Sequence, residues 1–133
     1  MKADAMLRTY PGDVGLDPDL LTRALEALAA CAQTCAACAD ACLAEDMVAD
    51  LRRCITTDLN CADICATTLG VLSRHTGYDA AVTRGQLQAC VAACGVCAAE
   101  CEQHAGMHEH CRVCAEACRE CEEACRALLA SIA

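Results

Sequence analysis

Apolar side chains recur at steps of three and four residues along most of this chain, which is the period of an amphipathic helix. Asp17 followed by Pro18 is a helix-start signal, and the periodic pattern continues from there to about residue 45. Turn and capping residues divide the remainder into further expected helices over residues 47–74, 79–104 and 108–133. No segment alternates with the period of a strand. The pattern therefore predicts an all-α chain.

Four helices of similar length with short connections fit an antiparallel up-down-up-down four-helix bundle. Residues 1–17 precede the first helix and contain a Pro11-Gly12 turn, so we expect an N-terminal leader followed by one bundle domain over residues 18–133. In such a bundle one end collects aliphatic flanks and forms a plug: Leu21, Leu25, Leu28, Leu69, Leu72, Val82, Leu87, Leu128, Leu129 and Ile132. The opposite end collects Met47, His104, Met107, His108 and His110.

The most specific feature is a repeated cysteine pattern, C-x3-C-x2-C-x3-C. The template recurs in all four expected helices, and 15 of its 16 slots are cysteine. In the second helix the remaining slot holds Asp58, and Cys111 lies outside the template. The cysteines are Cys31, Cys35, Cys38, Cys42, Cys54, Cys61, Cys65, Cys90, Cys94, Cys97, Cys101, Cys111, Cys114, Cys118, Cys121 and Cys125.

Steps of three and four residues place each set of cysteines on one face of its helix. Four such faces turned toward the bundle axis predict a cysteine-lined core. Buried cysteine can act simply as a small apolar residue, but four matching stripes favour a chemical role. The sequence contains only 24 Leu, Ile and Val residues and no Phe or Trp, so cysteine must also fill much of the core.

Charge and composition exclude several classes of function. A net charge of −9 disfavours binding to nucleic acid and to anionic membranes. The first 19 residues include Asp4, Arg8 and Asp13 and lack the apolar run of a secretory signal, so we expect a cytoplasmic protein. Because thiols stay reduced in that compartment, the cysteines are interpreted as metal ligands or redox groups rather than disulfides.

Spacing and charge balance point to Cu(I). Side chains at i,i+3 and i,i+4 have Cβ atoms ~5–6 Å apart, too far for an unstrained disulfide, whereas one metal can bridge two sulfurs up to about 4.6 Å apart. The spacing favours two-coordinate bridging within each helix. Four tetrahedral Zn²⁺ sites would leave about eight thiolate charges buried without compensation. One Cu(I) per thiolate leaves none, and soft thiolates select Cu(I).

The sequence offers further candidate metal ligands, and it leaves two alternatives to Cu(I) binding. His104, His108, His110 and Met47 are candidate ligands at the end opposite the leucines, and Asp58 is a candidate ligand in the tube wall. The alternatives are a zinc or cadmium sink of metallothionein type and an iron–sulfur or thiol redox protein. No catalytic constellation is recognisable, so we do not expect an enzyme.

The repeated cysteine stripe with its His/Met-rich mouth resembles the four-helix-bundle copper storage proteins, specifically their cytosolic branch. The resemblance covers about residues 18–132. It implies reversible storage of many Cu(I) ions, assembly into a homotetramer, and exchange with a copper donor or acceptor protein. It extends to every cysteine from Cys31 to Cys125, with His104, His108 and His110 near the mouth. Asp58 departs from the pattern, as does a mouth richer in His than in Met.

Overall fold

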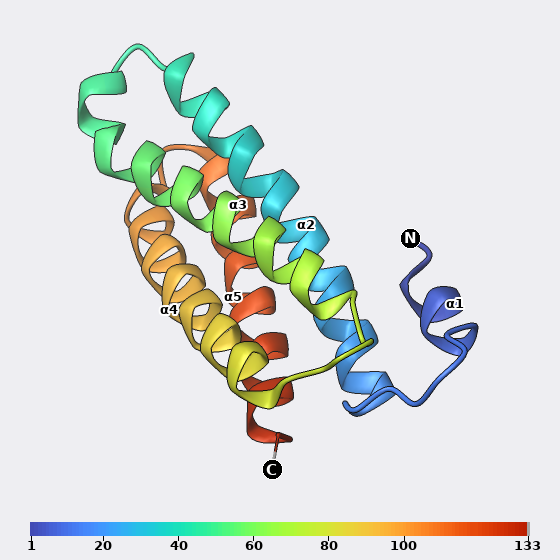
Figure 1. Cartoon of the computed structure of the whole chain (residues 1–133). Helices are drawn as coiled ribbons and strands as arrows, with labels where there is room; N and C mark the ends of the chain where they lie inside the picture. The colour runs from blue at the N-terminus through green and yellow to red at the C-terminus, as the bar shows by residue number, and fades with distance from the viewer. Residues whose placement is uncertain (133) are drawn as a thin grey trace.

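The computed structural model describes residues 1–132 and consists of helices in that range (Figure 1). The long helices are α2 (Pro18–Leu43), α3 (Arg52–Leu72), α4 (Ala80–His104) and α5 (Glu109–Ala130). A short helix, α1 (Ala3–Arg8), precedes them, and a 3₁₀ turn, η1 (Val48–Leu51), leads into α3. The expected all-α class is confirmed. Ala133, the last residue of the expected bundle domain, lies outside the described residues.

Two of the helix starts follow directly from capping chemistry. The Asp17 carboxylate accepts hydrogen bonds from the backbone N–H groups of Asp19 and Leu20, at 3.0 and 2.9 Å. Pro18 occupies the first helical position, where its missing N–H is not needed. At α4, the Asp79 carboxylate accepts from the Ala81 N–H at 2.9 Å. These caps place α2 and α4 as the sequence predicts.

The long helices pack in a ring in which α2 contacts α3 and α5, and α4 contacts the same two helices (Figure 1). The α2–η1 loop and the α4–α5 loop lie at one end, where Glu45 contacts His108 and His110. The α3–α4 loop lies at the other end, where the Thr76 hydroxyl is 2.9 Å from the Tyr10 hydroxyl. We call these the histidine end and the leucine end.

The leucine end is closed by aliphatic side chains. Leu21, Leu28, Leu72, Leu87 and Leu128 are fully or almost fully buried there, and Leu25 is 4% exposed. Leu69, Leu129 and Ile132 pack partly buried against them. The prediction for Val82 is wrong: its side chain is 61% exposed, because it lies in the first turn of α4 on the outer face.

Residues 1–17 contain more structure than the sequence indicates. Helix α1 packs against α2, and Leu7 and Val14 contact the core. The Tyr10 ring lies edge-on to the His75 ring, with centroids 5.3 Å apart. This segment therefore covers part of the leucine end. Within residues 1–132, no helix combines the length and apolar character that a membrane span requires.

Candidate metal centre

The cysteine stripes of α2, α3, α4 and α5 meet along the bundle axis. All sixteen thiols are buried, and none forms a disulfide. Steps of three and four residues keep the cysteines of each stripe on one face of their helix. Each long helix turns this face toward the bundle axis, so the four stripes meet there. The interior is therefore a continuous column of sulfur rather than a set of separated sites.

Sulfur atoms within one helix lie close together. The i,i+4 pairs are separated by 3.7 Å for Cys31 and Cys35 and by 3.8 Å for Cys61 and Cys65. The corresponding distances are 3.9 Å for Cys90 and Cys94 and 4.0 Å for Cys121 and Cys125. These separations are far beyond a disulfide bond of about 2.05 Å. They agree with thiols spaced to share a metal ion.

Sulfur atoms of different helices are equally close. Cys35 lies 3.5 Å from Cys118 and 3.7 Å from Cys114, while Cys65 lies 3.6 Å from Cys94. The expectation that each metal ion bridges two sulfurs of the same helix is therefore too narrow. Three sulfurs around one ion at about 2.3 Å lie about 4.0 Å apart, so the column also suits clusters that span helices.

Several sets of four donors lie within 4.8 Å of one another, and all their members are buried. One set joins Cys31, Cys65, Cys94 and Cys121, one from each long helix. A second set contains a carboxylate and joins Cys38, Cys54, Asp58 and Cys101. Because neighbouring sets share members, ions bound in them would be bridged by common thiolates. Such sharing favours polynuclear metal–thiolate clusters.

Asp58 points into the column and is fully buried. Its Oδ1 accepts hydrogen bonds from the thiols of Cys97, Cys101 and Cys114, at 3.1, 3.4 and 3.3 Å. Burial, followed by the negative charge on Cys114, raises the pKa of Asp58 from 3.8 to about 12. The carboxyl group is therefore protonated at neutral pH, and an ion bound beside it would have to displace that proton.

The thiols near Asp58 differ in their readiness to ionise. The hydrogen bond between Cys38 and Cys101 is the main cause that lowers the pKa of the Cys38 thiol to about 6. Burial, together with the negative charge on Cys38, raises the pKa of Cys42 and of Cys111. The pKa values of the Cys97 and Cys114 thiols are lowered as well, chiefly through their hydrogen bonds with Cys101, so a cation arriving here meets more than one sulfur that ionises readily.

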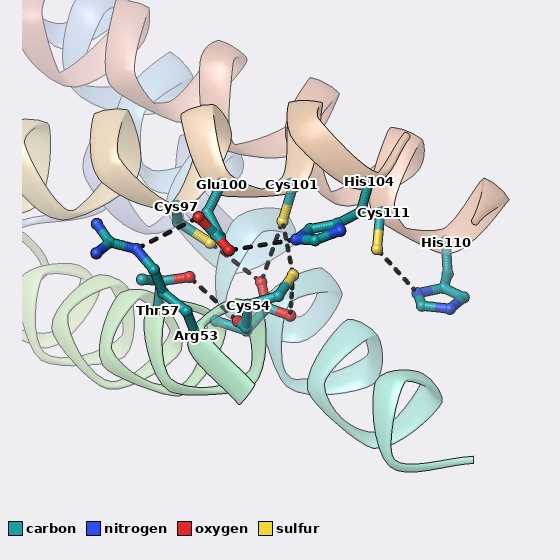
Figure 2. A network of polar contacts seen from close by, with 10 residues as sticks. Arg53, Cys54, Thr57, Cys97, Glu100, Cys101, His104, His110 and Cys111 are labelled. Carbon is teal, nitrogen blue, oxygen red and sulfur yellow. Dashed lines mark hydrogen bonds and ion pairs between the residues drawn. The ribbon is translucent and has the colours of Figure 1, made fainter. Parts of the chain in front are cut away.

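His110 links the column to the surface of the histidine end. Its Nδ1 lies 3.4 Å from the Cys38 Sγ. The same nitrogen lies 3.6 Å from the Cys111 Sγ (Figure 2). Its Nε2 lies 3.3 Å from the Glu45 carboxylate. Burial opposes its protonated form, but the hydrogen bonds to Cys38 and Glu45 outweigh burial and raise the pKa of His110.

The other two predicted histidines lie at the same end. His108 is 7% exposed, its Nδ1 contacts the Glu45 carboxylate, and its ring stacks on that of His110 with centroids 5.6 Å apart. His104 Nε2 lies 3.2 Å from the Glu100 carboxylate, which also holds Arg53 at 3.3 Å (Figure 2). All three histidines therefore lie at the end of the bundle where the sequence analysis placed them, and their role as metal ligands stays a prediction.

Met47 is the weakest of the predicted site residues. It directly precedes η1 at the histidine end and is 39% exposed, whereas every thiol of the column is buried. Conversely, sequence reasoning missed Glu45 and Glu100, the two acidic partners of the histidines. Glu100 could have been found, because it precedes His104 by four residues on one helix face. Glu45 lies 63 and 65 positions before its partners His108 and His110, so no local spacing connects them.

Comparison with known proteins finds a match to one protein family. The family model described as copper storage protein matches residues 18–130. A copper storage protein from Streptomyces lividans, Ccsp, solved with 10 copper equivalents, is 61% identical, with a TM-score of 0.96 over 97% of this chain and 98% of that chain. A second structure, a cytosolic copper storage protein from the same organism with five coppers, is 62% identical, with a TM-score of 0.86 over 86% and 96% of the two chains.

A more distant relative carries no assigned role. The uncharacterised cysteine-rich protein YhjQ of Bacillus subtilis is 38% identical over 90 residues, which cover 68% of this chain and 78% of that protein. The family model's match over residues 18–130 spans all sixteen cysteines of this chain.

Proposed function

The chain belongs to the copper storage protein family, and we propose that it stores many Cu(I) ions on the thiolates that line its core. The observation that carries the proposal is the column itself, in which all sixteen cysteines are buried and lie within bridging distance of others. Thiolate is a soft ligand that selects Cu(I). The column offers many equivalent donors and no unique position, which suits storage.

Charge balance supports Cu(I) over zinc or cadmium. If each divalent ion took four thiolates, half of the thiolate charge would stay buried without compensation, and each such charge costs several kcal/mol. One Cu(I) per thiolate neutralises the column. An iron–sulfur role is less favoured, because ferredoxin motifs place proline beside a cysteine, and Pro11 and Pro18 are both remote from the stripes.

The metal ligands we propose are the sixteen cysteines, with His104, His108 and His110 acting at the histidine end. Asp58 contacts three thiols from inside the column and is proposed as a ligand or as a hydrogen-bond partner of a cluster. Met47, on the surface of the same end, is proposed only as an early contact for copper. The storage domain would comprise residues 18–133, and residues 1–17 would form a segment that covers its leucine end.

We also propose that successive long helices run antiparallel, because the two loops that contact each other across Glu45 are the α2–η1 and α4–α5 loops. A cytoplasmic location is proposed from similarity to the cytosolic relative. Assembly into a homotetramer is proposed only from the resemblance of the cysteine stripes to the cytosolic copper storage proteins. Exposed apolar residues such as Leu59 and Val96 could contribute to a subunit interface. Storage rather than catalysis is proposed, because nothing in the column singles out one thiol for a reaction.

The test is an anaerobic titration of the reduced protein with Cu(I) in the presence of a competing chelator. We expect saturation near one ion per cysteine, with a few more at the histidines. The double variant Cys65→Ser/Cys94→Ser should saturate about two ions lower. Saturation near four ions per chain would reject the proposal and favour tetrahedral zinc-like sites, and a brown protein as isolated would favour an iron–sulfur cluster.

A further inference from the structure

One acidic side chain joins the two loops of the histidine end. Glu45 follows α2, whereas His108 and His110 lie at the start of α5. The same carboxylate oxygen, Oε2, contacts Nδ1 of His108 and lies 3.3 Å from Nε2 of His110. Glu45 is half-buried, at 32% exposure, so this anchor is partly shielded from water.

The chemistry of this contact fixes the tautomer of His110. An ionised carboxylate can only accept hydrogen bonds, so the Nε2 that faces Glu45 must carry the proton. In the neutral ring, Nδ1 is then the unprotonated nitrogen, with its lone pair free. That nitrogen is the one that lies 3.4 Å from Cys38 Sγ and 3.6 Å from Cys111 Sγ. In the neutral ring this lone pair faces the Cys111 thiol, which keeps its proton and can donate it to Nδ1. Toward Cys38 the same nitrogen donates only when the ring is protonated, and that contact is the one that raises the pKa of His110.

The orientation of the ring is restrained as well as its tautomer. His108 donates its Nδ1 proton to the same oxygen, and its ring stacks on that of His110 at an interplanar angle of 26°. Two rings held on one anchor have fewer rotamers available than one ring held at a single nitrogen. A carboxylate on the far nitrogen is also the usual support of a metal-binding histidine, where it fixes the ring and raises its basicity.

We propose that Glu45 is a positioning residue for copper transfer: it holds His110 so that Nδ1, with the sulfurs of Cys38 and Cys111, forms a three-donor site between the mouth and the column. The inference deepens the proposed function and rests on it. Glu45 does not touch the ion, and its effect passes through His110. Without Glu45, the His110 ring can exchange tautomers and turn away from the sulfurs. A smaller fraction of the molecules then presents the three donors together to an incoming ion.

A measurement on the copper-free, reduced protein tests the tautomer alone. At pH about 8.5, well above the ordinary histidine pKa, the ¹⁵N chemical shifts of the His110 imidazole should show a proton on Nε2 and none on Nδ1. Glu45→Ala should shift both nitrogens toward averaged values. Asp46→Asn is the matched control, since Asp46 is the exposed neighbouring acid in the same loop, and it should leave the shifts unchanged. Wild-type shifts in Glu45→Ala would overturn the proposal whatever the protein binds.

The functional test is stopped-flow transfer of Cu(I) from a chelator complex. Glu45→Ala should slow the first phase of loading about tenfold or more, with the final number of bound ions unchanged. Glu45→Gln keeps an accepting oxygen and should recover part of the rate, which a loss of loop structure would not predict. Equal rates in Glu45→Ala and wild type would overturn the positioning role, whereas failure of the wild type to take up copper would overturn the proposed function.

Discussion

The two ends of the bundle close the same four helices with opposite chemistry. At the leucine end, Leu28, Leu72 and Leu128 are 0–1% exposed and offer no donor atom to a cation. At the histidine end, His104 and His110 remain partly exposed, and acidic side chains from α4 and the α2–η1 loop hold them. An ion could pass between successive donors only at the second end.

The comparison separates what holds the fold from what handles the metal. Burying a leucine side chain contributes about 1.5–3 kcal/mol, whereas partly exposed ion pairs contribute at most about 1 kcal/mol each. Stability should therefore come mainly from the leucine end and the apolar thiols. The histidine end can then carry mobile, titratable groups without unfolding the bundle.

The largest effect is expected from Leu128→Ala at the leucine end. Because Leu128 is fully buried, the change should lower the free energy of unfolding of the copper-free protein by about 2–5 kcal/mol, measured by circular dichroism in denaturant. The copper loading rate should stay that of wild type. Leu43→Ala, at a residue 61% exposed, is the control and should shift stability by less than about 0.5 kcal/mol.

That experiment assumes that the protein folds without copper. Ala-rich helices have high intrinsic propensity, and protonated thiols pack as small apolar groups. A coil spectrum for the chelated, reduced wild type would contradict this assumption. It would mean that metal binding supplies the folding free energy and that the leucine end is not sufficient to hold the bundle together.

A second expected effect concerns the buried carboxyl group of the histidine half. The folded state raises the pKa of Asp58 from 3.8 to about 12, so the unfolded chain releases this proton and the folded chain keeps it. Stability from this group is therefore present below about pH 4 and is lost as pH rises. Asp58→Asn removes this dependence and should stabilise the copper-free protein at pH 7 by up to about 4 kcal/mol, since each pH unit contributes about 1.4 kcal/mol.

The measurement is the free energy of unfolding between pH 4 and 8, with Asp63→Asn, an exposed acid on the same helix, as the control. The difference between Asp58→Asn and wild type should grow with pH. A difference that stays constant across this range would mean that Asp58 is ionised in the folded protein and is matched by a charge not identified here.

Sequence reasoning reached the column because its cause is local. Helix periodicity alone puts Cys90, Cys94 and Cys97 on one face, and the caps at Asp17 and Asp79 mark where two helices begin. The confirmed helical class and the leucine plug, apart from Val82, follow from this local information. The copper storage family was recognised by the resemblance of the cysteine stripes, and the family model confirms it. The histidines at the opposite end were found because the flanks of the stripes meet there.

Features that depend on contacts between elements were missed. Helix α1 has six residues and no fully buried side chain, so its pattern is too short to detect, and its position depends on packing against α2. The closeness of sulfurs on different helices depends on how the helices are staggered along the axis. The Glu45 contacts join residues more than 60 positions apart. Such distances are set by tertiary packing rather than by sequence spacing.

A third prediction compares the ends directly. The variant His104→Ala/His108→Ala/His110→Ala should slow copper loading and removal about tenfold or more, while capacity stays nearly unchanged, because the thiolates hold most of the metal. The control is His75→Ala, since His75 lies at the leucine end beside Tyr10, and it should transfer copper at the wild-type rate. Equal rates in the triple variant would rule out a histidine gate, and a large loss of capacity would make these residues principal storage ligands.

The smallest effect is expected from pH. Hydrogen bonds to Cys38 and Glu45 outweigh burial and raise the pKa of His110 above its usual 6.5, so its protonation begins nearer to neutral pH than that of a free imidazole. A protonated ring cannot bind Cu(I). Loading of the wild type should therefore slow as pH falls toward about 5, through the loss of the free nitrogen that faces Cys38 and Cys111.

Acid also protonates thiolates, so the rate of the wild type alone cannot isolate the imidazoles. The ratio of wild-type to triple-variant rates removes the thiol contribution, because both proteins keep all sixteen cysteines. This ratio should be largest near pH 8 and approach one near pH 5. A ratio that does not change with pH would mean that the histidine end guides copper by shape or charge rather than by a free imidazole nitrogen, and the difference between the two ends would then not lie in their donor atoms.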